Sequence, residues 1–451
     1  MRSLSFSQVA SFLHTECSSQ ELMKRVIIDS REASAGTLFF ALPGEHTDGH
    51  QFVEDVLKQG GFAVVKTGYG SGDRVIEVAD PLEGLQRLAK QYLALFSVPV
   101  VAVTGSNGKT TTKDMIAAIL SEKWSVHKTQ GNFNNEIGLP LTVLGLDESH
   151  QILILEMGMR GLGQIFQLTQ IAPPDIAVIT NIGPVHLELL KTQKNIQHAK
   201  GEILTGLKPN GMAVLNGDDP LVRELGENSE HLVLYYGMRQ ACGLYASDII
   251  LDSLGRASFT CHYQQRTLPV SLPIPGVHNI NNALAAMGVG LRFGLSIDQC
   301  IKGLRSVIVS KMRMQLTEGQ KKIRIINDVY NASPASMKAA LDTLSSIETG
   351  KRRIAILGDM RELGELTQQA HIDIGNYAAR KCDHLVCIGQ YRNYLQEGAR
   401  LAGFCDSNIG VYECIEDFLD QIWQHIEPKD LVLIKASRGV ALERVVDVLE
   451  R

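Results

Sequence analysis

A glycine-rich stretch at residues 101–120 carries the clearest chemistry in the chain. It reads VAVTGSNGKTTTKDMIAAIL: an apolar run, a turn with two glycines, and a segment with apolar residues at helical spacing. This is the strand, loop and helix order of a phosphate-binding loop, in which backbone N–H groups and a helix N-terminus face an anion. Lys109 would reach the β- and γ-phosphates of a nucleotide, and the Thr110 hydroxyl would bind Mg²⁺. Val103 stands where the usual pattern has its first glycine, so the loop is a shortened TGxxGKT form.

Glu156 ends the apolar run ILILE in the stretch ILILEMGMRGLGQ. Burying a carboxylate is costly unless it is paired or bound to a metal ion. Two interpretations have equal weight on the residues alone. Glu156 could be a Mg²⁺ ligand beside Thr110, because magnesium prefers hard oxygen donors, or it could pair with an arginine such as Arg160.

The stretch TNIGPVHLELLKTQKNIQHAKGEIL contains a histidine after a Gly-Pro turn and a lysine on the helix that follows. A single histidine is more often structural than a metal ligand, and a single lysine on a helix is normally solvated. Residue chemistry alone therefore assigns a function to neither His186 nor Lys200.

The first turn of a predicted helix in LPIPGVHNINNALAAMGVG is crowded by His278, Asn279 and Asn282. Asparagine is common at helix N-termini as a cap, and capping is the favoured interpretation of Asn279. The same amides could equally present donor and acceptor groups to the edge of an adenine base.

The stretch IINDVYNASPASMKAAL places polar residues between a strand and a helix. Ser333 precedes Pro334, as expected for an N-cap followed by proline at the first helical position. Asp328, at the strand end, and Asn331 have no such structural role in the pattern, which favours a function for both.

The elements that must position these residues alternate between strand and helix. Apolar strands in 98–312 (VPVVAVTG, QILILEMG, PDIAVITNIG, GMAVLNGDD) and in 313–451 (IRIINDVYNASP, KRRIAILGDM, HLVCIGQ, DLVLIKASRG) are separated by helical stretches, whereas 1–97 mixes short strands and helices. We predict an α/β protein of three domains with these boundaries. The middle one would have a central P-loop-type parallel sheet with flanking helices, and the last would be a Rossmann-like C-terminal α/β domain. The polar clusters described above follow strands, at the sheet edge where such folds bind ligands.

Composition excludes several classes of function. The chain of 451 residues has a net charge of −5, which argues against nonspecific nucleic-acid binding. Its eight cysteines form no CxxC pair, so we expect reduced thiols rather than disulfides or a zinc site. No apolar signal core and no run of about 18 apolar residues is found. We therefore expect a cytoplasmic protein that binds neither nucleic acid nor membrane and is a monomer.

These clusters, in this order, resemble the Mur ligase family, the ATP-dependent amide-forming enzymes of bacterial peptidoglycan synthesis. The resemblance spans the whole chain and rests on the stretches DSREASAGTLFFALPGEHTDGHQF, TGSNGKTTTKD, GNFNNEIGLPLT, EMGMRGLGQI, TNIGPVHLE with AKGEI, PGVHNINNALAA, NDVYNASPASM, LGDMRELGE and KASRG. Several of these are shared with wider relatives such as the folylpolyglutamate synthases. GNFNNEIGLPLT, NDVYNASP and LGDMRELG together are typical of the branch that adds a dipeptide, and the Asp-Asn-Pro-Arg stretch of the diaminopimelate-adding relatives does not occur in the sequence.

The resemblance implies a bacterial ligase that joins D-alanyl-D-alanine to UDP-N-acetylmuramoyl-tripeptide through an acyl phosphate. ATP and two Mg²⁺ ions are the implied cofactors. The four implied catalytic residues are Lys109, Glu156, His186 and Lys200. One Mg²⁺ would be held by Thr110 and Glu156, and the second by His186 and Lys200, the lysine as a carbamate.

The resemblance also assigns binding residues. For ATP they are Gly105, Ser106, Asn107, Gly108, Lys109, Thr110, Thr111, Asn279, Asn282, Arg313 and Asp328. For the UDP-substrate they are Ser30, Arg31, Thr47, Asp48, Gly49 and His50 at the UDP end, with Asn134, Asn135 and Glu136 at the muramyl-peptide. For D-alanyl-D-alanine they are Asn331, Ser333 and the LGDMRELG loop. The chain departs from many relatives at Pro43, where they carry Lys or Arg, which leaves the uridine contacts open.

Three other functions are compatible with a phosphate-binding loop. A sibling amide ligase would use another amino acid or a folate. A P-loop ATPase would hydrolyse ATP with no acceptor present. A nucleotide-binding scaffold would have lost activity, which the presence of all four implied catalytic residues disfavours.

Overall fold

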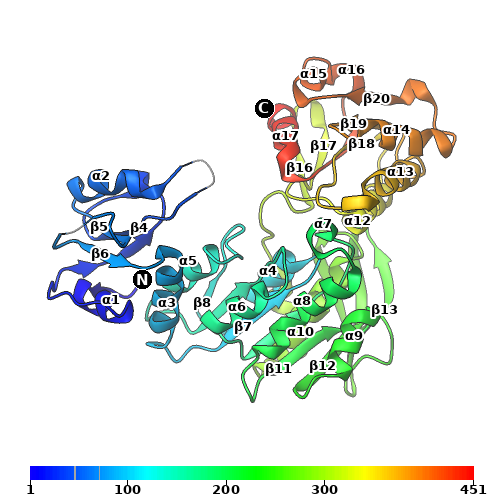
Figure 1. Ribbon diagram of the computed structural model, residues 1–451. Coiled ribbons are helices and arrows are strands. Elements are labelled where there is room, and N and C mark those ends of the chain that lie inside the picture. Colours follow the sequence, from blue (N-terminus) through cyan, green and yellow to red (C-terminus); the bar gives the residue numbers. More distant parts are fainter. Residues whose placement is uncertain (45–46, 71) are drawn as a thin grey trace.

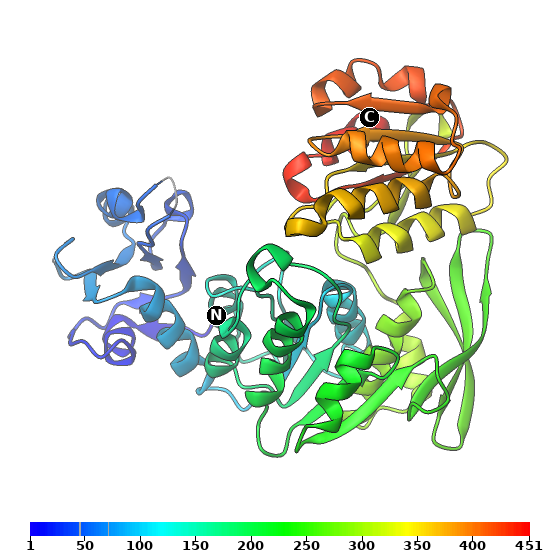
Figure 2. The ribbon, with the colours of Figure 1, turned by 45° about the vertical axis from the view of Figure 1, so that its right-hand side comes forward.

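The computed structural model describes residues 1–44, 47–70 and 72–451 and has three parts arranged in chain order (Figure 1). The N-terminal part lies at one end, the middle part carries the largest sheet, and the C-terminal part stands above the far side of the middle part (Figures 1 and 2). Among the described residues, none of the helices is long and apolar enough to cross a membrane.

The N-terminal part is built on a four-stranded parallel sheet in the order β3-β4-β5-β6. Its strands are β3 (Arg25–Ile27), β4 (Thr37–Phe40), β5 (Phe62–Lys66) and β6 (Val75–Val78), beside a small sheet of β1 (Leu4–Ser5) and β2 (Leu22–Met23). Its helices are α1 (Phe6–Phe12), α2 (Val53–Lys58) and α3 (Pro81–Leu93). Asp80 caps α3 and Pro81 takes its first position, which fixes where this long helix begins.

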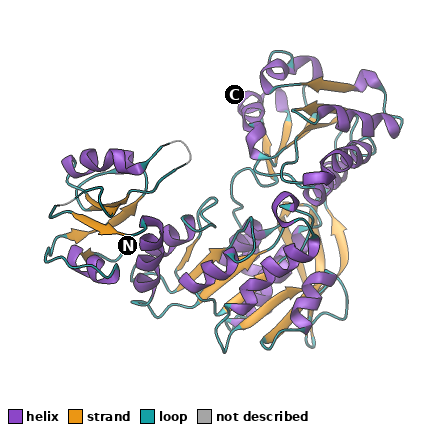
Figure 3. Ribbon diagram, viewed as in Figure 1, coloured by secondary structure: helices purple, strands orange, loops and turns teal. Residues whose placement is uncertain are grey.

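The middle part confirms the predicted parallel sheet with flanking helices (Figure 3). Its parallel strands, in sheet order, are β8 (Val126–Lys128), β9 (Ile152–Glu156), β7 (Val100–Thr104), β10 (Ile176–Ile179), β11 (Met212–Asn216) and β12 (Leu232–Gly237). The helices are α4 (Lys109–Leu120), α5 (Gly138–Leu144), α6 (Gln164–Ile171), α7 (Leu187–Leu190), α8 (Gln193–Thr205), α9 (Pro220–Glu227), α10 (Asn279–Arg292) and α11 (Ile297–Arg305).

Three further strands extend this sheet and, like β8 and β12, were not predicted. They are β13 (Leu244–Leu251), parallel to β12, and then β14 (Arg256–Tyr263) and β15 (Arg266–Pro275) in antiparallel order. Buried and more exposed positions alternate along much of β14, because one face of the added strands packs on the core. The middle sheet is therefore mixed, with nine strands in all among the described residues.

The C-terminal part has a six-stranded sheet in the order β16-β17-β21-β18-β19-β20, parallel except at the edge strand β16. The strands are β16 (Gln315–Glu318), β17 (Arg324–Asn327), β18 (Arg353–Gly358), β19 (His384–Ile388), β20 (Ile409–Tyr412) and β21 (Leu431–Lys435). The helices are α12 (Pro334–Ser346), α13 (Thr367–Ala378), α14 (Arg392–Leu401), α15 (Ile415–Leu419), α16 (Ile422–His425) and α17 (Glu443–Glu450). The parallel sheet with two buried apolar clusters matches the predicted Rossmann-like α/β arrangement.

The buried apolar clusters do not correspond one to one with the three parts of the chain. One cluster runs from the N-terminal sheet through α3 and α5 into the middle sheet, and includes Phe40, Leu85, Leu139 and Leu155. The C-terminal part has two clusters of its own, whose buried residues all come from position 314 onward. The N-terminal and middle parts are thus joined by a continuous core.

Candidate active site

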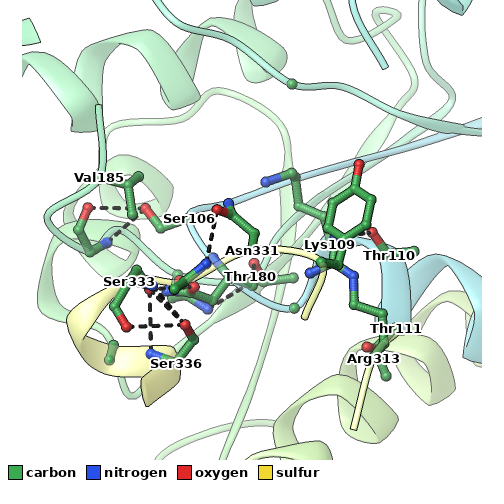
Figure 4. Close-up of a pocket in the computed structure, with 18 of the residues that line it drawn as sticks. Ser106, Lys109, Thr110, Thr111, Thr180, Val185, Arg313, Asn331, Ser333 and Ser336 are labelled. Atoms are coloured by element: carbon green, nitrogen blue, oxygen red, sulfur yellow. Dashed lines mark hydrogen bonds between the residues drawn. The ribbon is translucent and has the colours of Figure 1, made fainter. Parts of the chain in front are cut away.

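The phosphate-binding loop lies between the end of β7 and the start of α4 (Figure 4). Gly105 has a φ of +147°, and a Cβ at this position would overlap the Thr180 hydroxyl. A residue other than glycine would therefore be both strained and too large. Gly108 takes the left-handed conformation as the N-cap residue of α4, so Lys109 opens the helix.

The loop is held by the end of the neighbouring strand β10. The Asn107 carbonyl accepts hydrogen bonds from Thr180 Oγ1 at 2.6 Å and Asn181 Nδ2 at 3.0 Å, and the Asn107 N–H donates to Asn181 Oδ1 at 3.0 Å. Sequence reasoning missed Thr180 and Asn181, although they follow the strand IAVI at the sheet edge where ligands bind. They fix the conformation of the loop at Asn107.

Two lysines adjoin the loop from different helices. Lys109 Nζ donates to the Gly105 carbonyl at 2.8 Å, and burial lowers the pKa of this ammonium. Lys200, on α8, is only 2% exposed, and burial, together with the charge of Lys109, holds its pKa well below the usual value. No described residue makes a hydrogen bond or ion pair with its ammonium. Lys200 is therefore buried without a partner among the described residues, contrary to what is normal for a lysine on a helix.

Glu156 reaches the loop from the end of β9. Its carboxylate accepts hydrogen bonds from Thr110 Oγ1 at 2.8 Å and from Asn134 Nδ2 at 2.7 Å. Arg160, the alternative partner, instead lies 3.9 Å from Glu362. The arginine-pair interpretation is therefore wrong, and Glu156 faces the hydroxyl predicted to bind Mg²⁺.

His186 lies just before α7, in the left-handed conformation with a φ of +55°. Its Nδ1 is hydrogen-bonded to the carboxylate of Glu362, which belongs to the LGDMRELG loop of the C-terminal part. This contact lowers the pKa of Glu362. The histidine thus touches the C-terminal part, a contact that the sequence did not predict.

Asn279 and Asn282 are both buried at the start of α10. Asn279 donates to the Pro275 carbonyl at 2.7 Å, and Asn282 donates to Asn279 Oδ1 at 2.9 Å. His278 is the N-cap residue and makes no capping bond through its side chain, so the capping interpretation of Asn279 is wrong. The two amides form one fixed polar group on the cavity wall.

Arg313 and Asp328 enter from the C-terminal part. The Arg313 guanidinium carbon lies 3.9 Å from the centre of the Tyr330 ring, and its Nη2 is 3.4 Å from Thr110 Oγ1 (Figure 4). Asp328 pairs with the buried Lys435 at 2.5 Å. The expectation that Asp328 lacks a structural role is therefore wrong. Lys435, which sequence reasoning missed, ends the apolar strand β21 as Glu156 ends β9, so the same signal could have identified it.

Ser333 confirms its predicted cap. Its hydroxyl accepts the Ser336 N–H at 3.3 Å at the start of α12, with Pro334 in the first helical position. The same hydroxyl donates to Asn107 Oδ1 at 2.9 Å, which ties the C-terminal part to the phosphate-binding loop (Figure 4). Asn331 is exposed, and its carbonyl accepts a hydrogen bond from Lys435 at 2.8 Å.

These groups line one cavity of about 910 Å³ between the middle and C-terminal parts. Of the predicted site residues in these two parts, all except Gly105 contribute to its wall, including Asn134, Asn135 and Glu136. The predicted residues of the N-terminal part do not line it. The structure thus brings together the residues predicted to bind ATP, metal ions and the muramyl-peptide, and leaves those predicted for the UDP end elsewhere.

The predicted UDP-end residues follow strands of the N-terminal sheet. Arg31 is paired with Asp29 at 2.5 Å after β3. Thr47 and Gly49 flank Asp48 after β4, and Asp48 accepts the His50 backbone N–H at 3.0 Å. His50 Nε2 in turn accepts the Lys66 N–H at 2.9 Å, at the end of β5. Ser30 opens the short helical turn Ser30–Glu32.

Comparison with known proteins gives consistent matches along the chain. Residues 23–92 match the model described as Mur ligase family, catalytic domain, residues 103–290 the Mur ligase middle domain, and residues 312–438 the Mur ligase, glutamate ligase domain. A Bacillus subtilis (strain 168) protein named UDP-N-acetylmuramoyl-tripeptide–D-alanyl-D-alanine ligase is 39% identical over 440 residues, covering 96% of this chain and 94% of its own.

Solved structures agree with these matches. The crystal structure of MurF from Acinetobacter baumannii is 31% identical, with a TM-score of 0.90 over 100% of both chains. The MurF ligase from Thermotoga maritima in complex with ADP is 30% identical, with a TM-score of 0.84 over 95% of this chain and 97% of its own. From these full-length similarities we conclude that the chain belongs to the Mur ligase family, and within it to the MurF type.

Proposed function

We propose that this chain uses ATP to join D-alanyl-D-alanine to UDP-N-acetylmuramoyl-tripeptide, giving UDP-N-acetylmuramoyl-pentapeptide, ADP and phosphate. The observation that carries the proposal is the single cavity in which a phosphate-binding loop, Glu156 and Lys200 face Arg313 and Asp328 of the C-terminal part. The names of the relatives, and the ADP complex of one of them, support it.

The reaction we propose has two steps. The terminal peptide carboxylate attacks the γ-phosphorus of ATP, which forms an acyl phosphate and releases ADP. The neutral amine of the dipeptide then attacks the acyl carbon, and phosphate leaves as the amide forms. The first step brings two anions together, so catalysis requires charge neutralisation and positioning. Lys109, the loop N–H groups and Arg313 supply positive charge at the right place.

The donors beside the loop fit magnesium. The Thr110 hydroxyl and Glu156 carboxylate are hard oxygen ligands and would hold one ion. Burial lowers the pKa of Lys200 and so favours its neutral amine, the form that reacts with CO₂ to give a carbamate. That carbamate and His186 would hold a second ion. Bound Mg²⁺ would supply further charge neutralisation at the phosphates.

The remaining assignments concern the cosubstrates. We assign the UDP end to the N-terminal domain (1–97) through Ser30, Arg31 and residues 47–50, and the muramyl-peptide to residues 134–136. D-alanyl-D-alanine would bind the C-terminal domain (313–451) near Asn331, Ser333 and the LGDMRELG loop. Because the ATP residues lie in both the central domain (98–312) and the C-terminal one, nucleotide binding would draw these two together and exclude water from the acyl phosphate.

Phosphate release from ATP and Mg²⁺, measured with each cosubstrate omitted in turn, tests the proposal. We expect release only when both UDP-N-acetylmuramoyl-tripeptide and D-alanyl-D-alanine are present. Release with neither would identify an ATPase. Release with the UDP-substrate and another amino acid, but not with the dipeptide, would identify a sibling ligase.

A further inference from the structure

In the proposed reaction, D-alanyl-D-alanine carries a negatively charged C-terminal carboxylate before and after the amide forms. Its amine becomes part of the new amide, whereas its C-terminal carboxylate is unchanged. A carboxylate close to phosphates needs a cation of its own. Because an extended dipeptide spans at most about 7 Å, that cation must line the same cavity as the phosphate-binding loop.

Most cations on the cavity wall are already engaged. Lys435 is paired with Asp328 at 2.5 Å, and Arg160 lies 3.9 Å from Glu362. Three more adjoin the phosphate-binding loop: Lys109, Lys200 and Arg313. None of these five is free to bind a second anion away from the nucleotide.

The other two arginines on the wall are Arg361 and Arg438. Neither forms an ion pair with any residue in the described part of the chain. Arg361 Nη2 donates to the Gly439 carbonyl at 3.1 Å, and a Cβ at Gly439 would overlap the Arg361 guanidinium. This contact places the Arg361 guanidinium against the backbone of the residue that follows Arg438, and neither arginine has an anionic partner among the described residues.

Arg438 is the better placed of the two. It is exposed, follows β21 and opens the short helical turn Arg438–Val440. Its guanidinium carbon lies 5.8 Å from the centre of the Tyr330 ring, which Arg313 approaches to 3.9 Å. Arg313 in turn reaches Thr110 of the phosphate-binding loop. Tyr330 therefore connects Arg438 to the side of the cavity where ATP would react.

We infer that Arg438 binds the C-terminal carboxylate of D-alanyl-D-alanine and that Arg361 holds the backbone beside it in position. The inference rests on the proposed function and adds a specificity-determining residue to it. A guanidinium offers two parallel N–H donors to a carboxylate, so the enzyme would reject acceptors that lack this group.

The test compares two acceptors, D-alanyl-D-alanine and its C-terminal amide, in wild type, Arg438→Ala and Arg438→Lys. The control is Arg380→Ala, since Arg380 is exposed on the C-terminal part and its side chain donates a hydrogen bond to Asn376 of α13, away from the cavity wall. We expect Arg438→Ala to raise the KM for D-alanyl-D-alanine about 10- to 100-fold, as for a lost charged hydrogen bond. KM for ATP should not change, and Arg438→Lys should be intermediate.

The amide provides a readout that a structural defect would not produce. Wild type should strongly prefer the free carboxylate, and Arg438→Ala should lose this preference because the amide never used the arginine. If Arg438→Ala still preferred the free carboxylate over the amide as wild type does, or if its KM for ATP rose equally, this inference would be overturned. The proposed function would be unaffected. A wild type that does not ligate the dipeptide would overturn the proposed function and this inference with it.

Discussion

The ammonium of Lys200 is buried on α8 next to Lys109, without a hydrogen-bonding partner among the described residues. Burial beside Lys109 holds its pKa well below the usual value, which favours the neutral amine over the ammonium. An uncharged amine can be converted to a carbamate, which supplies the anionic oxygen that a metal site needs. Burial of Lys200 without a partner costs stability, and the same burial favours the uncharged amine from which a carbamate can form.

We expect Lys200→Ala to abolish ligation, with a loss of at least about 100-fold, since a metal ligand would be missing. A small carboxylate such as formate, which fits the vacated space, should restore part of the activity. Lys200→Arg is the matched control: it keeps the charge and cannot form this carbamate, and formate should not rescue it. Full activity of Lys200→Ala would remove the residue from the metal site.

Glu156→Gln tests the other metal position. The amide keeps an oxygen that can accept from Thr110 but loses the negative charge, so the Mg²⁺ concentration for half-maximal activity should rise about tenfold or more. Glu122→Gln, just beyond the C-terminal end of α4 and paired with Lys302, should leave the Mg²⁺ titration unchanged. A normal titration for Glu156→Gln would return this carboxylate to a structural role.

At the scale of elements, the phosphate-binding loop depends on how closely β10 approaches it. Gly105→Ala should weaken ADP binding and lower the stability of the fold by about 1–3 kcal/mol, because the backbone is strained and the Thr180 hydroxyl must move. Gly163→Ala is a matched control, since Gly163 also has a positive φ, +82°, but has open space around it. It should lose only about 1 kcal/mol and bind ADP normally. Calorimetric ADP binding and thermal unfolding measure both effects.

Much of the fold could be predicted from the sequence because buried parallel strands are continuous apolar runs, as in VVAVT and ILILE. The strands β13 to β15 lack such runs, since one of their faces is more exposed, and they were missed. Strand-end charges were informative, as Glu156 shows. The contacts of His186 with Glu362 and of Ser333 with Asn107 join parts of the chain that are far apart in sequence, and no local pattern encodes them.

A pair of histidines, one of them at the start of β19, is expected to make the free energy of unfolding depend on pH. His384 Nε2 lies 2.7 Å from His425 Nδ1, and burial lowers the pKa of His384 to about 4 from its usual 6.5. Between these values the unfolded chain binds a proton that the folded chain does not. The free energy of unfolding should therefore fall as the pH falls from 6.5 towards 4, by up to about 1.4 kcal/mol per pH unit.

His384→Gln, which keeps a group able to bond to His425, should flatten this dependence. Urea unfolding at about pH 7.5 and about pH 5 measures it. We expect a smaller difference between the two pH values in the variant than in wild type. Equal differences would show that other groups dominate the acid sensitivity.

At the scale of the whole molecule, the three parts are not equally independent. The N-terminal and middle parts share one apolar cluster, whereas the C-terminal part has its own. We expect scanning calorimetry without ligands to resolve two transitions rather than three, because a shared core unfolds cooperatively. Adding ADP should raise both transition temperatures, since the residues that we propose bind it come from both sides of the cavity. Three separate transitions would contradict this account.

The shared core also bears on how such a chain can be recombined. A hybrid that takes its C-terminal part from a relative would cut the molecule where few apolar contacts cross, near residue 312. A hybrid joined near residue 97 would pack the counterparts of Phe40 and Leu85 from one protein against the counterpart of Leu139 from another, in one packed interior. The last part is therefore the exchangeable module, and the first two should be inherited together, even though sequence comparison divides the chain into three.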